Sequence, residues 1–260
     1  MFKHLHIVSC APRSGTTLLH EVMVTCFKID KHYDHELRFH KARAKSGQIL
    51  LTKRPKDTLY VPQLLARDAE FFVIYLLRDP RDVIVSRHAK DDSRYYVNVR
   101  VWREMHGIAK ALDGHPRFLS LKYEDFVRAP DQTQDRICER FPWLEPTHRF
   151  SDYHLHAQVS AKSKRAMHGV RAIGSDSVGT WRRNLARIKG QQETHGSLTP
   201  DLMECGYEAS NAWESALADV TADSGPSVYP ERLHPLRRIV RALDARRKVW
   251  TYARRRARLR

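Results

Sequence analysis

Residues 8–23, VSCAPRSGTTLLHEVM, combine residue types that suit the binding of an anion. An apolar run typical of a strand leads into a short turn, and a second apolar run, typical of a helix, follows Gly15. This arrangement directs several backbone N–H groups and the positive end of a helix toward one point, and a glycine lets the backbone approach the ligand closely. Further hydrogen-bond donors are the hydroxyl groups of Ser14, Thr16 and Thr17. We therefore expect an anion site, although an ordinary turn with Ser/Thr caps has the same pattern.

A second segment, YLLRDPRDVIVSRH at residues 75–88, places an arginine and a serine where they can bind a second anion. Arg78 follows the most hydrophobic strand-like run of the chain, and Ser86 comes eight residues later on a predicted helix. A guanidinium group and a hydroxyl group in this arrangement can bind one phosphate together. The alternative is a charged connection between a strand and a helix, in which Asp79 or Asp82 lies near the start of the helix.

The elements around these two segments alternate between strand and helix. Apolar runs predict strands at residues 4–9, 48–53, 70–77 and 117–123. Helical patterns predict helices at residues 16–27, 58–68, 81–89, 99–112 and 131–141. Strands separated by helices imply right-handed crossovers and a mainly parallel sheet with helices on both faces, in which ligands bind at the carboxyl ends of the strands. We therefore predict a single α/β domain over residues 1–220, with Arg78 beside the turn that contains Gly15.

The composition argues against several other classes of protein. A chain of 260 residues with 42% hydrophobic residues can bury a substantial core. Apolar runs such as residues 71–77 are far shorter than the roughly 20 residues that span a bilayer, and the chain begins directly with strand-like sequence, so we expect neither a transmembrane helix nor a signal peptide. The four cysteines form no C-x-x-C pair and the fifteen histidines have no ligand spacing. We therefore expect a reducing, cytoplasmic compartment and no metal site.

The basic residues concentrate at the C-terminus. Residues 231–260 contain twelve Lys or Arg and two acids, a net charge of +10 out of +16 for the chain, and they follow a Gly/Pro/Ser-rich segment at 221–231 that we interpret as a linker. Apolar residues at helical spacing are Leu236, Ile239, Val240, Leu243 and Val249 or Trp250. We predict a basic amphipathic tail at residues 232–260 that binds the anionic inner face of a membrane. A disordered basic tail and a nonspecific contact with nucleic acid are the alternatives.

As a pair, APRSGTTLL at residues 11–19 and LLRDPRDVIVSR at residues 76–87 resemble the two signatures of the PAPS-dependent sulfotransferase family, where PAPS is 3′-phosphoadenosine 5′-phosphosulfate. Two later elements are also similar to that family, LSLKYEDFVRAP at residues 119–130 and SVGTWRRNL at residues 177–185. The resemblance is closer to the carbohydrate and bacterial members than to the cytosolic members that act on phenols and steroids. It implies that the opening turn binds a phosphosulfate group.

The resemblance also implies roles for individual residues. The turn with Arg13 would bind the 5′-phosphosulfate, and Arg78 and Ser86 would bind the 3′-phosphate. Further contacts to the nucleotide are expected from Tyr123, Arg171 and Trp181. A position in the core is the alternative for the tryptophan, and a solvated basic face is the alternative for the arginine.

The sequence departs from the phenol and steroid members at two positions. Their lysine in the first motif is replaced by Arg13, and LLTKRPKD places Lys53 near the position of their catalytic histidine. Because a lysine is protonated by default, we assign Lys53 to stabilisation of the sulfuryl or leaving group. For the base, residues 33–40 offer Asp34, His35, Glu36 and His40. The resemblance to carbohydrate and bacterial members, several of which have a catalytic glutamate in this segment, favours Glu36, with His35 as the second candidate. A solvated loop of mixed charge is the alternative for both.

We therefore predict the transfer of a sulfuryl group from PAPS to a hydroxyl group of an acceptor, a saccharide or glycolipid rather than a phenol. The donor chemistry requires no metal. A kinase on a related fold is opposed by the missing G-x-x-x-x-G-K-[ST] pattern. A basic protein that binds nucleic acid or membrane is the third class, but the tail lies outside all four family elements.

Overall fold

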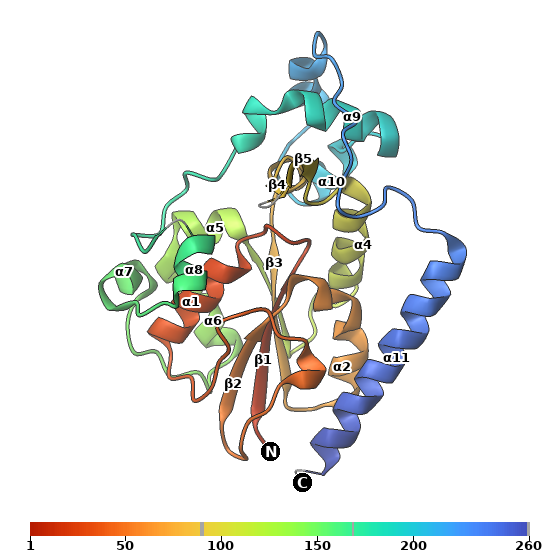
Figure 1. The fold of residues 1–260 in the computed structure, drawn as a ribbon. Helices are drawn as coiled ribbons and strands as arrows, with labels where there is room; N and C mark the ends of the chain where they lie inside the picture. Colours follow the sequence, from red (N-terminus) through yellow and green to blue (C-terminus); the bar gives the residue numbers. More distant parts are fainter. Residues whose placement is uncertain (89–90, 168, 259–260) are drawn as a thin grey trace.

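Parallel strands form the central sheet in the computed structural model, which describes residues 1–88, 91–167 and 169–258. The strands are β1 (Lys3–Ser9), β2 (Ile49–Lys53), β3 (Phe71–Leu77) and β6 (Phe118–Lys122), in the order β2-β1-β3-β6 (Figure 1). Each strand lies within one residue of the run that predicted it, and the predicted parallel α/β sheet is confirmed. Ile7 is in register with Lys53, and Ser9 is in register with Leu76. The carboxyl ends of β1, β2 and β3 therefore meet at one edge of the sheet.

Helices cover both faces of the sheet because both faces of its strands are apolar. Ile74 and Leu76 belong to one buried cluster, together with residues of α1 (Thr16–Cys26) and α6 (Pro130–Arg140). Val73 and Tyr75 belong to a second cluster, together with residues of α2 (Val61–Arg67) and α4 (Val99–Lys110). Successive side chains of a strand point to opposite faces, so the continuous apolar run of β3 is typical of a strand that is covered on both sides.

The remaining elements are mostly short, and several of them surround the carboxyl edge of the sheet. The 3₁₀ helices are η1 (Phe39–Lys41), η2 (Pro55–Tyr60), η3 (Phe150–Asp152), η4 (Thr180–Arg183) and η5 (Asn211–Leu217). The other α-helices before the C-terminus are α3 (Pro80–Ile84), α5 (Tyr123–Arg128), α7 (Tyr153–His156), α8 (Ala161–Ala166), α9 (Leu185–His195) and α10 (Thr199–Glu204). A separate antiparallel pair consists of β4 (Arg87–His88) and β5 (Asp91–Tyr95).

The helix predicted at residues 81–89 is wrong beyond residue 84. The amide of Ser86 donates a hydrogen bond to the carbonyl of Val83 (3.2 Å), and the chain then continues as β4. Residues 83–85 are all β-branched, which favours an extended backbone over a helix. Ser86 therefore follows the helix rather than lying on it, and residue 89 lies outside the described residues.

The predicted C-terminal helix is present as α11 (Pro235–Ala257), and it packs against the body over part of its length (Figure 1). Its second half buries Val249, Tyr252 and Arg256. The carboxylate of Asp68 accepts hydrogen bonds from the hydroxyl of Tyr252 (3.0 Å) and from the guanidinium of Arg256 (2.7 Å). Side chains of its first half that are between 57 and 65% exposed are Leu236, Ile239, Val240 and Leu243. The predicted apolar face of the helix is thus exposed in the first half of α11 and partly buried in the second half. The boundaries of the domain and the linker at residues 220 and 231 stay predictions.

No helix within the described ranges is both long enough and apolar enough to cross a membrane.

Candidate active site

A cavity of about 660 Å³ opens at the carboxyl edge of the sheet. We call it the catalytic cavity. The predicted site residues that line it are Arg13, Gly15, Thr16, Thr17, His35, Glu36, Lys53, Arg78, Ser86, Tyr123 and Arg171. Ser14 and Trp181, which were also predicted, are not among its lining residues. The volume lies within the range of about 300 to 1,000 Å³ that ligand sites usually have.

The turn before α1 is strained in a way that suits a binding loop. Arg13 has a φ of +76°, which a residue with a side chain rarely adopts, and it is exposed at the cavity. Gly15 has a φ of +86°, and a Cβ atom at this position would lie 2.4 Å from Cε2 of Tyr123. A glycine is therefore required both by the backbone conformation and by the close approach of this tyrosine.

Ser14 has a different environment from its two neighbouring threonines. Its side chain is fully buried, and its hydroxyl donates a hydrogen bond to the carbonyl of Ala11 (2.7 Å). This bond closes the turn, so the hydroxyl of Ser14 stabilises the loop instead of facing the cavity. Thr16 and Thr17 do line the cavity at the start of α1.

Arg78 links the turn to the segment before η4. One of its guanidinium nitrogens donates a hydrogen bond to the carbonyl of Arg13 (2.9 Å), and another donates to the carbonyl of Ser177 (2.5 Å). The guanidinium also lies 4.4 Å from the centre of the Tyr123 ring, and its Nε is buried without a partner among the described residues. Carbonyl and aromatic contacts orient the guanidinium without neutralising its charge, so it remains suited to an anion.

Ser86 and Tyr123 lie at the same cavity. The hydroxyl of Ser86 is 3.4 Å from the carbonyl of Asp82, which is at the long limit for a hydrogen bond. The hydroxyls of Tyr123 and Ser177 are 2.6 Å apart. Both residues therefore line the same cavity as Arg78, and their part in binding a phosphate stays a prediction.

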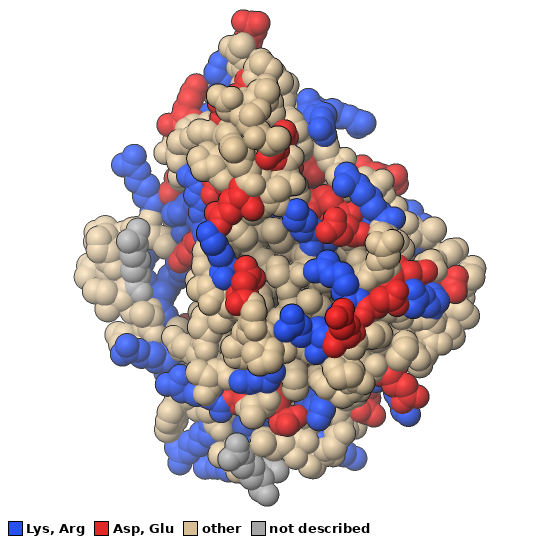
Figure 2. Space-filling view, turned by 180° about the vertical axis from the view of Figure 1, so that it is seen from behind, with Lys and Arg blue, Asp and Glu red and all other residues tan. Residues whose placement is uncertain are grey.

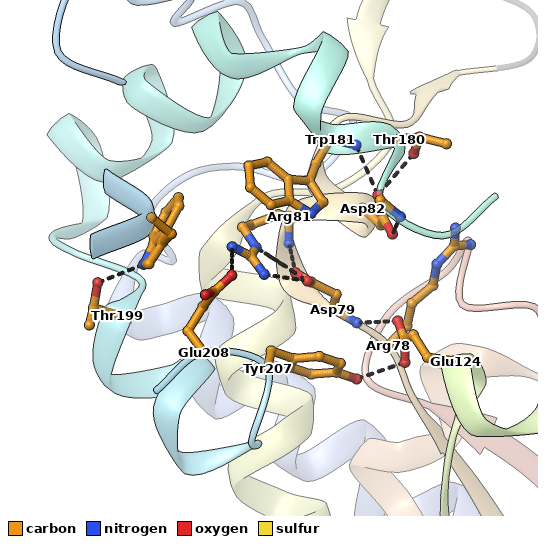
Figure 3. A network of polar contacts seen from close by, with 12 residues as sticks. Arg78, Asp79, Arg81, Asp82, Glu124, Thr180, Trp181, Thr199, Tyr207 and Glu208 are labelled. Carbon is orange, nitrogen blue, oxygen red and sulfur yellow. Dashed lines mark hydrogen bonds and ion pairs between the residues drawn. The ribbon is translucent and has the colours of Figure 1, made fainter. Parts of the chain in front are cut away.

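The two aspartates of the second segment hold neighbouring elements in place (Figure 3). Asp79 caps α3, since its carboxylate accepts a hydrogen bond from the amide of Arg81 (2.8 Å). Asp82 accepts hydrogen bonds from the amide of Gly179 (2.8 Å) and from the amide of Trp181 (2.9 Å). The alternative predicted for this segment was a charged connection between a strand and a helix, with an aspartate near the start of the helix. This feature is present, because Asp79 and Asp82 lie at the start of α3 and stabilise neighbouring elements, while Arg78 faces the cavity.

Trp181 lies in a core cluster beside this network. The tryptophan is 5% exposed and packs with Ile84, Ile188 and Leu198. Its ring centre lies 4.0 Å from the guanidinium carbon of Arg81. The structure thus gives Trp181 the core position that we named as the alternative to a contact with adenine.

Lys53 at the end of β2 is nearly buried and faces an acid that the sequence analysis missed. Its Nζ lies 3.8 Å from Oε1 of Glu21, and this carboxylate also accepts a hydrogen bond from the hydroxyl of Ser163 (2.8 Å). Burial lowers the pKa of Lys53, although Glu21 and Glu36 oppose this effect. Burial raises the pKa of Glu21, but the hydrogen bond from His20 and the other contacts outweigh it, so the pKa is lower than usual.

Glu21 could have been recognised from the sequence, because it is a single acid among the apolar residues of α1. A charged residue on the buried side of a helix normally has a specific partner. Asp34, which was named among the possible bases, also lines the cavity. Other lining residues that the sequence analysis did not name are Tyr96, Tyr153, Lys162 and Ser163.

Glu36 and His35 line the cavity from the segment between α1 and η1, and both side chains are exposed. Arg171 lines it from the segment between α8 and η4. The cavity lining contains five Lys or Arg and three acids, so it favours an anionic ligand. Within residues 1–88, 91–167 and 169–258, no group of three or more His, Cys, Asp and Glu is placed to hold a metal ion.

Comparison with a family model gives a match over residues 23–143, and the matching family is described as the sulfotransferase family. The matched range contains Lys53, Arg78, Ser86 and Tyr123, and it begins within α1, after the first turn. A comparison with curated proteins gave no significant match.

Three solved structures with similarity to this chain come from sulfotransferase domains and a dehydratase. The sulfotransferase domain of the Synechococcus PCC 7002 olefin synthase is 16% identical over 70% of this chain and 87% of that chain, with a TM-score of 0.46. The sulfotransferase domain from the curacin biosynthetic pathway is 15% identical over 92% of this chain and 96% of that chain, with a TM-score of 0.43. Retinol dehydratase, in complex with androsterone and the inactive cofactor PAP, is 15% identical over 88% of this chain and 83% of that chain, with a TM-score of 0.44.

Proposed function

We propose that this chain transfers a sulfuryl group from PAPS to a hydroxyl group of an acceptor, because residues 23–143 match the model of the sulfotransferase family. The observation that carries the proposal is the position of Arg78. Its guanidinium contacts the carbonyl of Arg13 in the turn before α1, so the two predicted anion sites form one cavity. A donor with phosphate groups at both ends of a nucleoside requires two such sites at a fixed separation.

Each part of the cavity has a role in the proposed reaction. The turn with Arg13, Thr16 and Thr17 binds the 5′-phosphosulfate, and Arg78 and Ser86 bind the 3′-phosphate. The acceptor oxygen forms a bond to sulfur while the bond from sulfur to the bridging phosphate oxygen breaks, which releases 3′-phosphoadenosine 5′-phosphate, PAP. Cationic groups stabilise the charge that develops on the transferred group and on the leaving phosphate.

Lys53 and Glu36 complete this mechanism. Lys53 lies within the cavity with Glu21 as its buried partner, which holds the ammonium group in one place. In the proposal, Lys53 stabilises the sulfuryl group during transfer. Glu36 accepts the proton of the acceptor hydroxyl, and His35 is the second candidate for this role.

The acceptor in this proposal is a saccharide or glycolipid, and α11 attaches the enzyme to a membrane surface from the cytoplasmic side. Supporting this, Leu236, Ile239 and Leu243 form an exposed apolar row on a basic helix. Figure 2 shows the molecule from behind, with α11 at the left edge, where an uncharged surface is bordered by Lys and Arg. A basic helix with an apolar face suits an anionic lipid surface.

Calorimetry with PAP tests the donor site. We expect saturable binding at micromolar concentrations, and no binding would contradict the proposal. Co-sedimentation with anionic vesicles tests the membrane contact, with Ile239→Asp as the variant and Leu155→Asp, at another exposed apolar site on α7, as the matched control. Deleting the tail is less suitable, because it would remove the partners of Asp68 along with the exposed face.

A further inference from the structure

A second cavity, of about 400 Å³, lies between α11, α4 and η2. We call it the α11 groove. Apolar or aromatic side chains of its wall include Leu59, Tyr60, Met105 and Val240. Its lining also contains six Lys or Arg and a single acid. The proposed donor site uses none of these residues.

The cations of the α11 groove are only partly neutralised. Four of the six have carboxylate partners: Arg100 and Arg241 with Glu104, Arg54 with Asp57, and Lys248 with Asp244. Among the residues that the structure describes, Lys56 and Arg237 pair with no carboxylate, and Lys56 instead lies 4.6 Å from the centre of the Tyr229 ring. Positive charge therefore remains beside an apolar wall, which is the chemistry that binds an anionic amphiphile.

The end of β2 separates the α11 groove from the catalytic cavity. Lys53 and Pro55 line the catalytic cavity, whereas Arg54 and Lys56, which alternate with them along the chain, line the groove. A ligand in the groove would therefore contact residues that are close in the chain to Lys53, which lines the proposed site of sulfuryl transfer.

Tyr229 marks the same boundary. Its hydroxyl is buried without a hydrogen-bond partner among the described residues, and its ring lines the α11 groove. Burial and the carboxylate of Glu36 raise the pKa of Tyr229 to about 12, so the hydroxyl lies within electrostatic reach of the proposed base. A buried hydroxyl without a partner is uncommon, and a polar group of a ligand would satisfy it.

We propose that the α11 groove binds the acceptor, and that this acceptor is an anionic glycolipid, that is, an anionic amphiphile with a hydroxyl in its head group. Its hydrocarbon chain packs against Leu59, Met105 and Val240, and its anionic group binds Lys56 and Arg237. The head group then extends past Tyr229 toward Glu36. This assignment of the acceptor rests on the proposed sulfuryl transfer, whereas binding in the groove does not.

The groove opens beside the exposed row of α11, since Val240 lines it and Ile239 and Leu243 are exposed on the same helix. A lipid surface in contact with that row would place amphiphiles at the mouth of the groove. Contact with a lipid surface would therefore account for both the exposed apolar row of α11 and the groove beside it, neither of which belongs to the catalytic cavity.

Calorimetry on the full-length protein tests the inference, with dodecyl phosphate below its critical micelle concentration as the probe. Glycerol phosphate, which lacks the chain, and dodecyl maltoside, which lacks the charge, are the matched probes. We expect saturable binding of dodecyl phosphate alone. Val240→Asp and Arg237→Glu should each weaken it by about tenfold or more, since one places a charge against the chain and the other reverses the charge at the anion.

Leu243→Asp and Arg246→Glu provide matched controls, because they make the same changes on the same helix at positions that do not line the groove. Both should bind dodecyl phosphate within about twofold of the parent protein. Binding of PAP to every variant, measured in parallel, shows that the variants are folded and keeps the donor site separate from the groove.

The outcomes separate the two proposals. Equal losses in the controls, or equal binding of dodecyl maltoside, would overturn the groove assignment. Binding of PAP without binding of dodecyl phosphate would overturn the groove and leave the donor site standing. Binding of dodecyl phosphate without PAP would support an amphiphile site and contradict sulfuryl transfer from PAPS, together with the acceptor role of the groove.

Discussion

Arg78 and Arg81 belong to the same short segment, yet they face two different regions of the molecule (Figure 3). Arg78 faces the catalytic cavity and contacts carbonyl groups and a tyrosine ring. Arg81 faces the core, where Asp79 and Glu208 lie 2.8 and 2.6 Å from its guanidinium. Trp181 and Trp213 lie against the same guanidinium, with ring centres 4.0 and 4.8 Å away.

The difference between the two arginines lies in what balances their charge. Asp79 and Glu208 neutralise the charge of Arg81, so this guanidinium stabilises the fold and is not available to bind an anionic ligand. Arg78 is oriented without being neutralised, so its charge is available to a ligand. An arginine in a functional motif is therefore assigned to binding or to structure by its partners and not by its position in the motif.

The largest expected effect is on stability, from Arg81→Ala. Removing this side chain leaves two carboxylates without their partner, and we expect a loss of about 3 to 5 kcal/mol in the free energy of unfolding, measured by chemical denaturation. Arg182→Ala is the matched control, because Arg182 also lies over Trp181, at 4.5 Å, but is exposed. A similar loss in both variants would show that stacking on the tryptophan, rather than charge neutralisation, holds Arg81.

The next effect is on nucleotide affinity, from Arg78→Ala. We expect a loss of about 2 to 5 kcal/mol in the binding of PAP, measured by calorimetry, if Arg78 pairs with a phosphate that is largely removed from water. Arg87→Ala, an exposed arginine on the adjacent hairpin, should leave the affinity nearly unchanged. Unchanged affinity in Arg78→Ala would remove the distinction between the two arginines.

A smaller effect is expected on catalysis, from Glu36→Gln. The change removes the proposed base while keeping the shape of the side chain, so turnover should decrease by about 10² and PAP affinity should stay the same. His35→Gln tests the second candidate, and Asp34→Asn is the control within the same segment. A decrease confined to His35→Gln would assign the base to the histidine.

The smallest effect is expected in the pH dependence of stability, from Lys53→Met. Burial lowers the pKa of Lys53 in the folded chain, so between this pKa and the ordinary value of about 10.4 the unfolded chain binds a proton that the folded chain has released. The contribution of Lys53 to stability should therefore rise with pH across this window. Denaturation of both proteins between neutral and alkaline pH measures it, and a constant difference would contradict the lowered pKa.

Much of the fold and part of the site could be predicted from the sequence. The apolar runs at residues 4–9 and 70–77 lie in strands β1 and β3, because a strand covered on both faces needs a continuous apolar segment. The order of strands and helices then placed Arg13 and Arg78 at one edge of the sheet. The hairpin of β4 and β5 was missed, because the helix was extended through residues 85–88.

By itself, the sequence determined the central sheet, the turn with Gly15 and the meeting of Arg13 and Arg78, because these depend on local periodicity and on the order of elements along the chain. Only the tertiary structure decided which side chains face the cavity. Ser14 turns inward to Ala11, Trp181 packs on Arg81, and Glu21 meets Lys53 across two elements. The same holds for α11, whose second half contacts the body of the protein through hydrogen bonds to Asp68. The direction of a side chain and the exposure of a helix face depend on partners distant in the sequence, and periodicity carries no information about those partners.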